Sequence, residues 1–409
     1  MAVFREISFG QTNFPNQFLE NPIKQELKLN VPFKSCWIFP FQTNVLTNIA
    51  SDNESLIYIP FFNGEIVAVT SEFGTLTWKT DLGGQIVSDI LVSGENLYVI
   101  SKTDQNADEK INEKITGKKI TEQNIEKNTE DSEVYKYTAT IRSIHNSTGI
   151  TVWEVKLPVS EKNFLYEYSH SLIVIDWEGF IYRIEKQSGR IIWKSKLESK
   201  LTATPHLELN ALILGLSTNQ IIDLSLDTGK VITKVRVPFE PTTVMSVKND
   251  KKLFWGDRKG IVTSANWSSA KANTLKTNLK TNWKFRIGAE ISHIVSTPEG
   301  LLISSFDNFV YLISEKSGRI IWKRRFVGRI SFKPLVVGNF AVISVFAEPE
   351  AFVIETNSGR LVNKFSLTED NFFIESPLRI KNKLFFPTLK GLFSFSQNEC
   401  PENLLNKAG

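Results

Sequence analysis

The sequence has little of the residue types on which many enzymes depend. Its 409 residues include only two cysteines, two methionines and four histidines. No two of the histidines have the spacing of a zinc site, and no Walker loop, dinucleotide fingerprint or Gly-x-Ser-x-Gly motif is present. These absences disfavour any enzyme whose chemistry rests on one local motif. They leave open a site assembled from distant loops.

Long apolar runs are also missing. No window approaches the roughly 18 apolar residues of a membrane helix, so we expect no transmembrane segment. The start, Met-Ala-Val-Phe-Arg-Glu, lacks the basic stretch and apolar run of a signal peptide. We therefore expect a cytoplasmic protein, or a periplasmic one if a signal peptide has been removed. In a reducing compartment Cys36 and Cys400 would be free thiols, and this is our expectation for them.

No stretch of the chain keeps a 3.6-residue apolar period, which predicts little helix. What the chain has instead is a repeated turn and strand. A glycine is followed four residues later by a fixed position, usually tryptophan, as in Gly318 and Trp322. Six glycines take this turn position: Gly74, Gly149, Gly189, Gly229, Gly318 and Gly359.

The positions that follow these turns, together with Trp37 and Trp283, which lack the glycine, recur with a period near 40 residues. We call them ring positions, and there are eight of them: Trp37, Trp78, Trp153, Trp193, Thr233, Trp283, Trp322 and Asn363. Their separations are 41, 75, 40, 40, 50, 39 and 41 residues. A period of this length is typical of one four-stranded propeller blade, and the two long intervals indicate insertions.

Within the sixth copy four short strands can be placed from turn signals. They are Ile291–Ser296, Leu301–Ser305, Phe309–Ile313 and Ile320–Phe326. The sequence therefore predicts an all-β protein, an eight-bladed β-propeller of four-stranded antiparallel blades. A tryptophan on the outer strand is large enough to reach the neighbouring blade, so we assign the six ring tryptophans a structural, blade-docking role.

The predicted organisation has three parts. Residues 1–30 form an N-terminal arm, 31–399 form the propeller, and 400–409 form a C-terminal tail. Residues 103–134 are rich in Glu, Lys, Asn and Asp, and we expect them to be a disordered insertion between two strands of one blade. A second polar insertion, near Ser268–Thr281, replaces the tight turn of the fifth copy.

Closure of the ring follows from the register. The last copy, Lys383–Gln397, has three strands at most, and Trp37 supplies the missing ring position. We therefore expect the N-terminal strand Cys36–Phe41 to complete the eighth blade beside Phe393–Ser396. In that register Cys36 lies about two strand residues from Cys400, roughly 6.6 Å. This predicts two neighbouring thiols, and a bond between them is the less favoured alternative.

The repeat resembles the tryptophan-docking repeat of the pyrroloquinoline-quinone-type (PQQ-like) β-propellers. The best matches are Gln187–Trp193 and Lys316–Trp322, and the resemblance covers about Phe33 to Glu399. That family includes quinone-dependent alcohol dehydrogenases, BamB-like assembly factors of the outer membrane, and many binding propellers. The resemblance to its enzymes implies an adjacent pair of cysteines against the quinone, which this sequence lacks.

Two function classes follow from the resemblance. We favour a non-catalytic, BamB-like scaffold for protein–protein interaction that needs no cofactor and no metal. The alternative is a PQQ-dependent dehydrogenase-like protein or another propeller enzyme that binds a small ligand. A protein without an export signal or lipid-attachment cysteine departs from the BamB pattern, which leaves its compartment open.

Charge is unevenly distributed along the chain. Residues 230–333 hold 20 Lys and Arg against 7 Asp and Glu, although the net charge of the whole chain is only +4. Such an excess gives one side of the ring a positive field. We predict that the cluster Lys323, Arg324, Arg325 and Arg329 binds an acidic protein partner. A solvated surface is the alternative, and we expect no nucleic acid partner and a monomeric protein.

Overall fold

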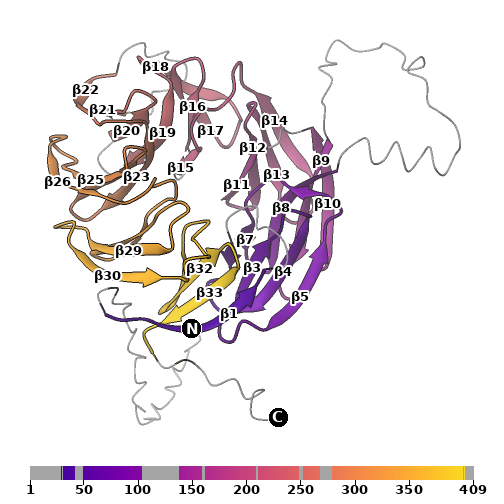
Figure 1. Ribbon diagram of the computed structural model, residues 1–409. Coiled ribbons are helices and arrows are strands. Elements are labelled where there is room, and N and C mark those ends of the chain that lie inside the picture. The colour runs from indigo at the N-terminus through magenta and orange to yellow at the C-terminus, as the bar shows by residue number, and fades with distance from the viewer. Residues whose placement is uncertain are drawn as a thin grey trace, which may run out of the picture.

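The computed structural model is a closed ring of eight antiparallel sheets arranged around a centre (Figure 1). It describes residues 29, 31–41, 49–103, 138–158, 162–208, 211–247, 252–267, 279–398 and 400. Within these ranges the chain forms strands and turns and no helix. The predicted eight-bladed, all-β propeller is therefore confirmed. We number the blades 1 to 8 in chain order.

Blades 1 to 4 occupy the first half of the chain. Their strands are β2 (Ala50–Ser51), β3 (Leu56–Pro60), β4 (Glu65–Thr70) and β5 (Leu76–Asp81) in blade 1; β6 (Gln85–Ile86), β7 (Leu91–Ser93), β8 (Asn96–Thr103), β9 (Thr138–His145) and β10 (Thr151–Pro158) in blade 2; β11 (Asn163–Tyr168), β12 (Ser171–Asp176), β13 (Phe180–Glu185) and β14 (Ile191–Lys196) in blade 3; and β15 (His206–Glu208), β16 (Ala211–Leu216), β17 (Gln220–Ser225) and β18 (Val231–Arg236) in blade 4. In blade 2 the innermost strand is split, because β6 and β7 both pair with β8.

Blades 5 to 8 complete the ring. Their strands are β19 (Pro241–Val247), β20 (Lys252–Asp257), β21 (Ile261–Asn266) and β22 (Thr281–Arg286) in blade 5; β23 (Ile291–Thr297), β24 (Gly300–Ser305), β25 (Phe309–Ile313) and β26 (Ile320–Arg325) in blade 6; β27 (Leu335–Val337), β28 (Phe340–Ser344), β29 (Glu350–Glu355) and β30 (Leu361–Ser366) in blade 7; and β31 (Leu378–Ile380), β32 (Lys383–Thr388), β33 (Gly391–Ser396) and β1 (Lys34–Pro40) in blade 8. The strands of the sixth copy differ from those predicted by one residue at most at each end.

Burial follows the position of a strand within its blade. The second strand of a blade lies between two neighbouring sheets, so β12 and β24 are buried at every residue. The outer strand has one face toward solvent, and β14 and β26 accordingly have no fully buried residue. The short apolar runs of the sequence thus correspond to the buried second strands. The runs that mix apolar and polar residues correspond to the outer strands.

The core is a set of layers between blades. The described residues form eight buried hydrophobic clusters, and each one joins side chains of two adjacent blades. Blade 3 and blade 4, for example, share the cluster that contains Ile175, Leu197, Leu214 and Ile222. Because no blade buries its apolar faces alone, the stability of each blade depends on its two neighbours.

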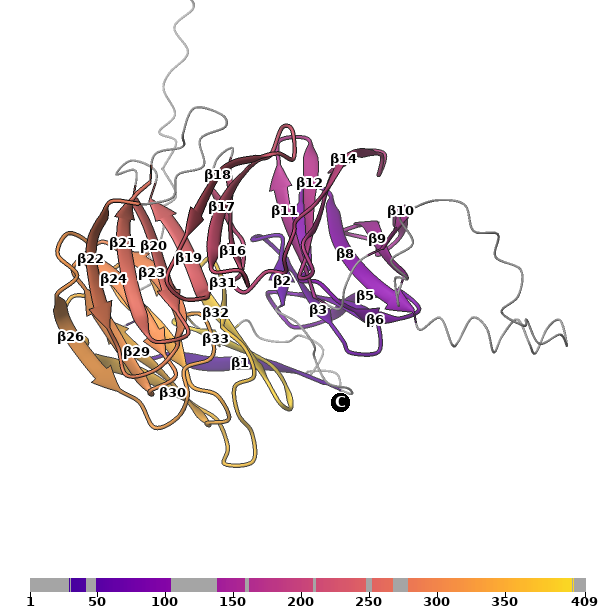
Figure 2. The same cartoon turned by 90° about the horizontal axis from the view of Figure 1, so that it is seen from above.

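The ring closes by pairing the two ends of the propeller. Strand β1 lies antiparallel to β33, with Trp37 opposite Ser394, and the sheet order is β1-β33-β32-β31. Figures 1 and 2 both place indigo β1 next to yellow β33. The prediction that the N-terminal strand completes the eighth blade is confirmed.

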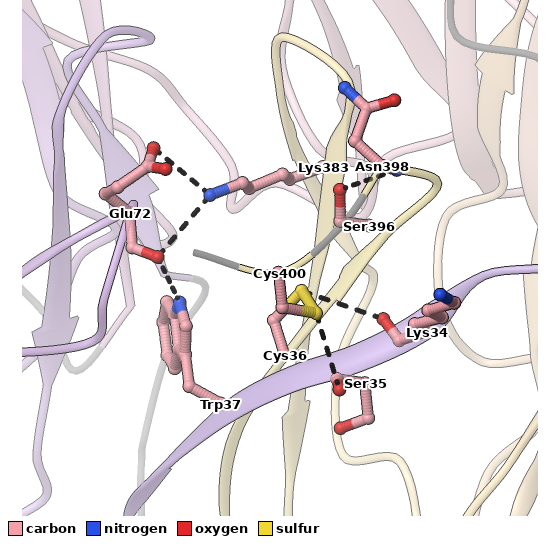
Figure 3. Close-up of a disulfide and its surroundings, with 9 residues drawn as sticks. All are labelled: Lys34, Ser35, Cys36, Trp37, Glu72, Lys383, Ser396, Asn398 and Cys400. Atoms are coloured by element: carbon pink, nitrogen blue, oxygen red, sulfur yellow. Dashed lines mark hydrogen bonds and ion pairs between the residues drawn. A yellow bond between two sulfur atoms is a disulfide. The ribbon is translucent and has the colours of Figure 1, made fainter. Parts of the chain in front are cut away.

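A disulfide joins Cys36 of β1 to Cys400 just after β33, with a Cα–Cα distance of 5.1 Å (Figure 3). The expectation of two free thiols was therefore wrong, whereas the predicted proximity is confirmed. In the other blades a turn or loop joins the third strand to the outer one. Blade 8 has a break in the chain at this place, and the disulfide supplies a covalent link there.

Several predicted segments lie outside the described residues. These are the N-terminal arm except Leu29, the C-terminal tail except Cys400, and nearly all of the 103–134 insertion. The ends of that insertion are described: Thr103 of β8 is paired with Thr138 of β9. The insertion thus leaves and re-enters one blade between adjacent strands, as predicted.

The disulfide should contribute strongly to stability, because it links residues 364 positions apart. Cross-links that close long loops restrict the unfolded chain most, so we expect Cys36→Ser to lower the free energy of unfolding by about 4 kcal/mol. Denaturant unfolding with and without a reductant measures this. Reductant should bring the wild-type midpoint to that of Cys36→Ser and leave the variant unchanged. Equal midpoints for all samples would contradict a structural disulfide.

Candidate functional site

Each ring tryptophan docks on the turn of the next blade. The indole Nε1 of Trp322, for example, donates to Thr356 O at 2.8 Å, across the interface between blades 6 and 7. The indole also lies against Gly359, where an added Cβ would be 2.6 Å from Trp322 Cδ2. The same contact recurs in six pairs: Trp37 with Gly74, Trp78 with Gly149, Trp153 with Gly189, Trp193 with Gly229, Trp283 with Gly318, and Trp322 with Gly359.

The turn requires glycine for two separate reasons. All six glycines have a positive φ, between 65° and 74°, which side chains with a Cβ rarely adopt. In addition, the space that a Cβ would occupy is filled by the indole of the preceding blade. The glycine of one repeat and the tryptophan of the repeat before it therefore form one structural unit.

Asn363 replaces the tryptophan between blades 7 and 8. Its Nδ2 donates to Leu29 O at 3.3 Å and to Val31 O at 2.8 Å. Leu29 is fully buried in the cluster that contains Phe365 and Phe386. Residues just before β1 thus supply the acceptors that a turn supplies in other blades. The sequence did not indicate this contact, because it joins residues more than 330 positions apart.

Thr233 replaces the tryptophan between blades 4 and 5. It is buried opposite Asp223 on β17, and neither side chain has a hydrogen-bond partner for its oxygens among the described residues. Burial raises the pKa of Asp223 to about 6. Trp267, directly after β21, belongs to the buried cluster at this interface and contributes its ring from the blade 5 side.

The predicted basic cluster is divided by the structure. Lys323 and Arg325 are exposed and alternate on one face of β26. Arg324 points the other way, and its Nε donates to Gly359 O in the docking turn of blade 7. Arg329 lies in the loop after β26, with its guanidinium 5.6 Å from the Phe306 ring centroid. Arg324 therefore has a packing role, and three cations remain accessible.

Cations recur on neighbouring outer strands, and all but Lys234 are exposed. In blades 3 to 6 the residues one and three positions after the ring position are all Lys or Arg. We call these eight residues the basic outer wall: Lys194, Lys196, Lys234, Arg236, Lys284, Arg286, Lys323 and Arg325. Of these, only Lys234 forms an ion pair within the described ranges. Blades 1, 2, 7 and 8 carry at most one cation at these two positions. An alignment of the outer strands on the ring position could have revealed this wall.

Ionisable groups also occur beside the innermost strands. Burial lowers the pKa of His293 on β23 to about 4, with a further contribution from Lys333, so the imidazole is neutral at physiological pH. Burial raises the pKa of Glu375, before β31, and the negative charge of Asp89 adds to this. In the described part of the chain no three His, Cys, Asp or Glu side chains are grouped as metal ligands. Nor does that part contain a helix long and apolar enough to cross a membrane.

A family model described as outer membrane protein assembly factor BamB matches residues 34–129 and 137–276, which is more than half of the chain. The chain belongs to this BamB family. The suspected resemblance to PQQ-like propellers of the BamB type is thereby confirmed.

Individual relatives of the BamB family are distant. The outer membrane protein assembly factor BamB of Salmonella typhimurium is 20% identical over 151 residues, which cover 35% of this chain and 28% of that protein. The crystal structure of BamB from Moraxella catarrhalis has a TM-score of 0.62 and 14% identity, covering 91% of this chain and all of that one. The quinohemoprotein alcohol dehydrogenase of Comamonas testosteroni has a TM-score of 0.61 and 10% identity, covering 91% of this chain and 78% of that one. At these identities the two structures establish the fold alone.

The docking turns make a direct prediction about stability. Gly318→Ala places a Cβ about where the Trp283 ring lies, so we expect a loss of about 3 kcal/mol or more in the free energy of unfolding. Gly338→Ala is a matched control, because Gly338 also has a positive φ but nothing within 4 Å of its added Cβ. It should cost only about 1 kcal/mol. Equal losses in the two variants, measured by denaturant unfolding, would contradict the docking contact.

The buried Asp223 predicts a stability that depends on pH. A carboxyl whose pKa rises from 3.8 in the unfolded chain to about 6 in the fold loses stability as pH increases from about 4 to 6. Asp223→Ser, which introduces the residue found opposite Trp153, Trp283 and Trp37, should therefore stabilise the protein by about 2–3 kcal/mol at pH 7.5. It should bring no such gain near pH 4. The same difference between variant and wild type at both pH values would rule out a buried, ionising carboxyl.

Proposed function

We propose that this protein is a non-catalytic scaffold that binds protein partners, in the manner of the outer membrane assembly factors whose family it shares. The proposal rests on the match of the BamB family model to residues 34–129 and 137–276. These residues include the strands of blades 1 to 4. A ring of interlocked blades presents a rigid surface for recognition.

We further propose that the partner is acidic and docks on the side of blade 6. Lys323 and Arg325 project from an outer strand with an unpaired edge, and Arg329 follows in the adjoining loop. Like-signed neighbours on blades 3 to 5 extend the positive surface around the ring. Such a field accelerates association with a negatively charged partner and orients it before contact.

The disulfide supports an oxidising compartment such as the periplasm. Disulfides persist where thiols are not kept reduced, and they are rare in the cytosol. This favours the second of the two locations that the sequence left open. It also agrees with a role in outer membrane protein assembly, which the description of the family model names.

A quinone-dependent dehydrogenase is the second candidate, favoured only by the shared fold of the Comamonas testosteroni enzyme. The sequence has two cysteines in all, and they are bonded to each other where the ring closes. Neither is therefore left to form the adjacent cysteine pair that family enzymes place against a quinone. The scaffold is the better supported of the two functions.

The scaffold proposal predicts a charge-dependent capture of envelope proteins. We expect immobilised protein to retain components of the outer-membrane assembly machinery from detergent-solubilised envelopes of the native organism. A variant with Lys323, Arg325 and Arg329 changed to Glu should bind them more slowly at low salt and lose most of the salt dependence. Arg324 is left unchanged because it packs against blade 7.

The matched control changes Lys79 and Lys156 to Glu, since these lysines occupy the same repeat positions on blades 1 and 2. It should bind like the wild type. If both variants bind equally well, the partner does not use the basic cluster. If no assembly component is retained by any of the three proteins, the scaffold role near the outer membrane is wrong.

A further inference from the structure

Among the eight outer strands, blade 3 has the smallest side chain at one position that faces the next blade. The residue two positions after the ring position faces the next blade, because side chains alternate along a strand. In seven blades this residue is Phe39, Thr80, Val155, Val235, Phe285, Arg324 or Phe365. Phe285 and Phe365 pack into the buried clusters of their interfaces. In blade 3 the residue is Ser195, which is too small to fill the same space.

The result is a cavity of about 600 Å³ between the outer parts of blades 3 and 4. Leu197, Leu216 and Ile222 line its apolar inner end, and all three belong to the buried cluster of this interface. Ser195, Gln220 and Lys234 add polar groups to its walls. The volume lies in the range of sites that bind small molecules, and so does the combination of an apolar interior with a few polar groups.

The charges at the cavity favour an anion. Lys234 Nζ lies 3.1 Å from Glu198 Oε2, but the Glu198 side chain is 88% exposed. The Lys234 side chain is 30% exposed, and a pair with so exposed a carboxylate contributes about 1 kcal/mol, so a bound anion can displace Glu198 from Lys234. Lys230, also exposed, adds a second positive charge to the lining. Lys196 also lines the cavity, but its Nζ lies 3.6 Å from the Phe180 ring centroid and donates to Glu178 O at 3.0 Å.

A second cavity, of about 460 Å³, lies at the equivalent place between blades 6 and 7. There Arg324 occupies the position of Ser195, and its guanidinium donates to the docking turn of blade 7. That cavity thus retains a long side chain fixed across it, whereas the cavity of blade 3 does not. Of these two cavities, the one beside Ser195 has no such side chain fixed across it, and it is also the larger.

We propose that the cavity between blades 3 and 4 binds a small amphipathic anion. The apolar body of this ligand lies on Leu197, Leu216 and Ile222, and its anionic group replaces Glu198 as the partner of Lys234. This function goes beyond the proposed scaffold role, because it needs no protein partner and none of the cations on blade 6, although Lys234 also belongs to the basic outer wall.

The test uses two fluorescent probes that differ by one charge. 8-Anilinonaphthalene-1-sulfonate carries a sulfonate on an aromatic body, and N-phenyl-1-naphthylamine is its neutral counterpart. We expect saturable binding of the anionic probe to the folded protein at one site. Ser195→Phe copies Phe285 and Phe365 and should weaken that binding about tenfold or more, without lowering the melting temperature. Thr80→Phe, at the same repeat position in blade 1, should leave the binding unchanged.

Two further variants test the role of charge. Glu198→Gln frees Lys234 and should strengthen binding of the sulfonate about two- to fivefold, with no gain for the neutral probe. Lys234→Met should weaken binding of the sulfonate and spare the neutral probe. These opposite effects are expected only if the anion takes the place of Glu198.

Three results would overturn the proposal. One is undiminished sulfonate binding to folded Ser195→Phe, and another is an equal response of both probes to Glu198→Gln and Lys234→Met. The third is an absence of saturable binding to the wild type. If Ser195→Phe does not fold, Ser195→Val replaces it, since valine occupies this position in blades 2 and 4. Because the assay contains no partner protein, its outcome does not depend on the scaffold proposal.

Discussion

The indole of one blade resting on the glycine turn of the next is the contact on which the ring depends. The glycine meets two requirements of this contact. The turn needs a positive φ, and the indole needs the space that a Cβ would fill. Local turn geometry and packing between blades are thus specified by the same residue pair. Burying each tryptophan contributes on the order of 2–3 kcal/mol, and six such contacts act around one closed ring.

A ring held by contacts between neighbours must still be closed where the chain begins and ends. Here three features act at the closing blade: β1 pairs with β33, Asn363 of blade 7 donates to Leu29 O and Val31 O, and the disulfide links Cys36 to Cys400. Trp37 then docks on blade 1, and Lys383 also contacts Glu72 of that blade (Figure 3). The closing blade is thereby tied to both of its neighbours, although its outer strand comes from the other end of the chain.

Much of this fold could be predicted because the same pattern of strands and turns recurs eight times in the sequence. The strands of the sixth copy and the pairing of the N-terminal strand with the last blade follow from turn signals and a period near 40 residues. The oxidation state of Cys36 could not be predicted in this way, since sequence spacing gives proximity but not the redox environment. Nor could the different roles of Arg324 and Arg325, because adjacent residues of an outer strand face opposite sides and only the packed neighbours show which side is occupied.

At four interfaces between blades, a residue of the outer strand departs from the repeat. Ser195, Thr233, Arg324 and Asn363 all lie on the face of an outer strand that meets the next blade. Each departure has a physical consequence there: a cavity, a buried carboxyl, a fixed guanidinium, or contacts with the closing segment. Blades with an intact docking pair hold the ring together, so individual interfaces can lose a bulky side chain without loss of the fold. Because several docking contacts stabilise the propeller, one interface between blades can acquire a ligand site while the fold is kept.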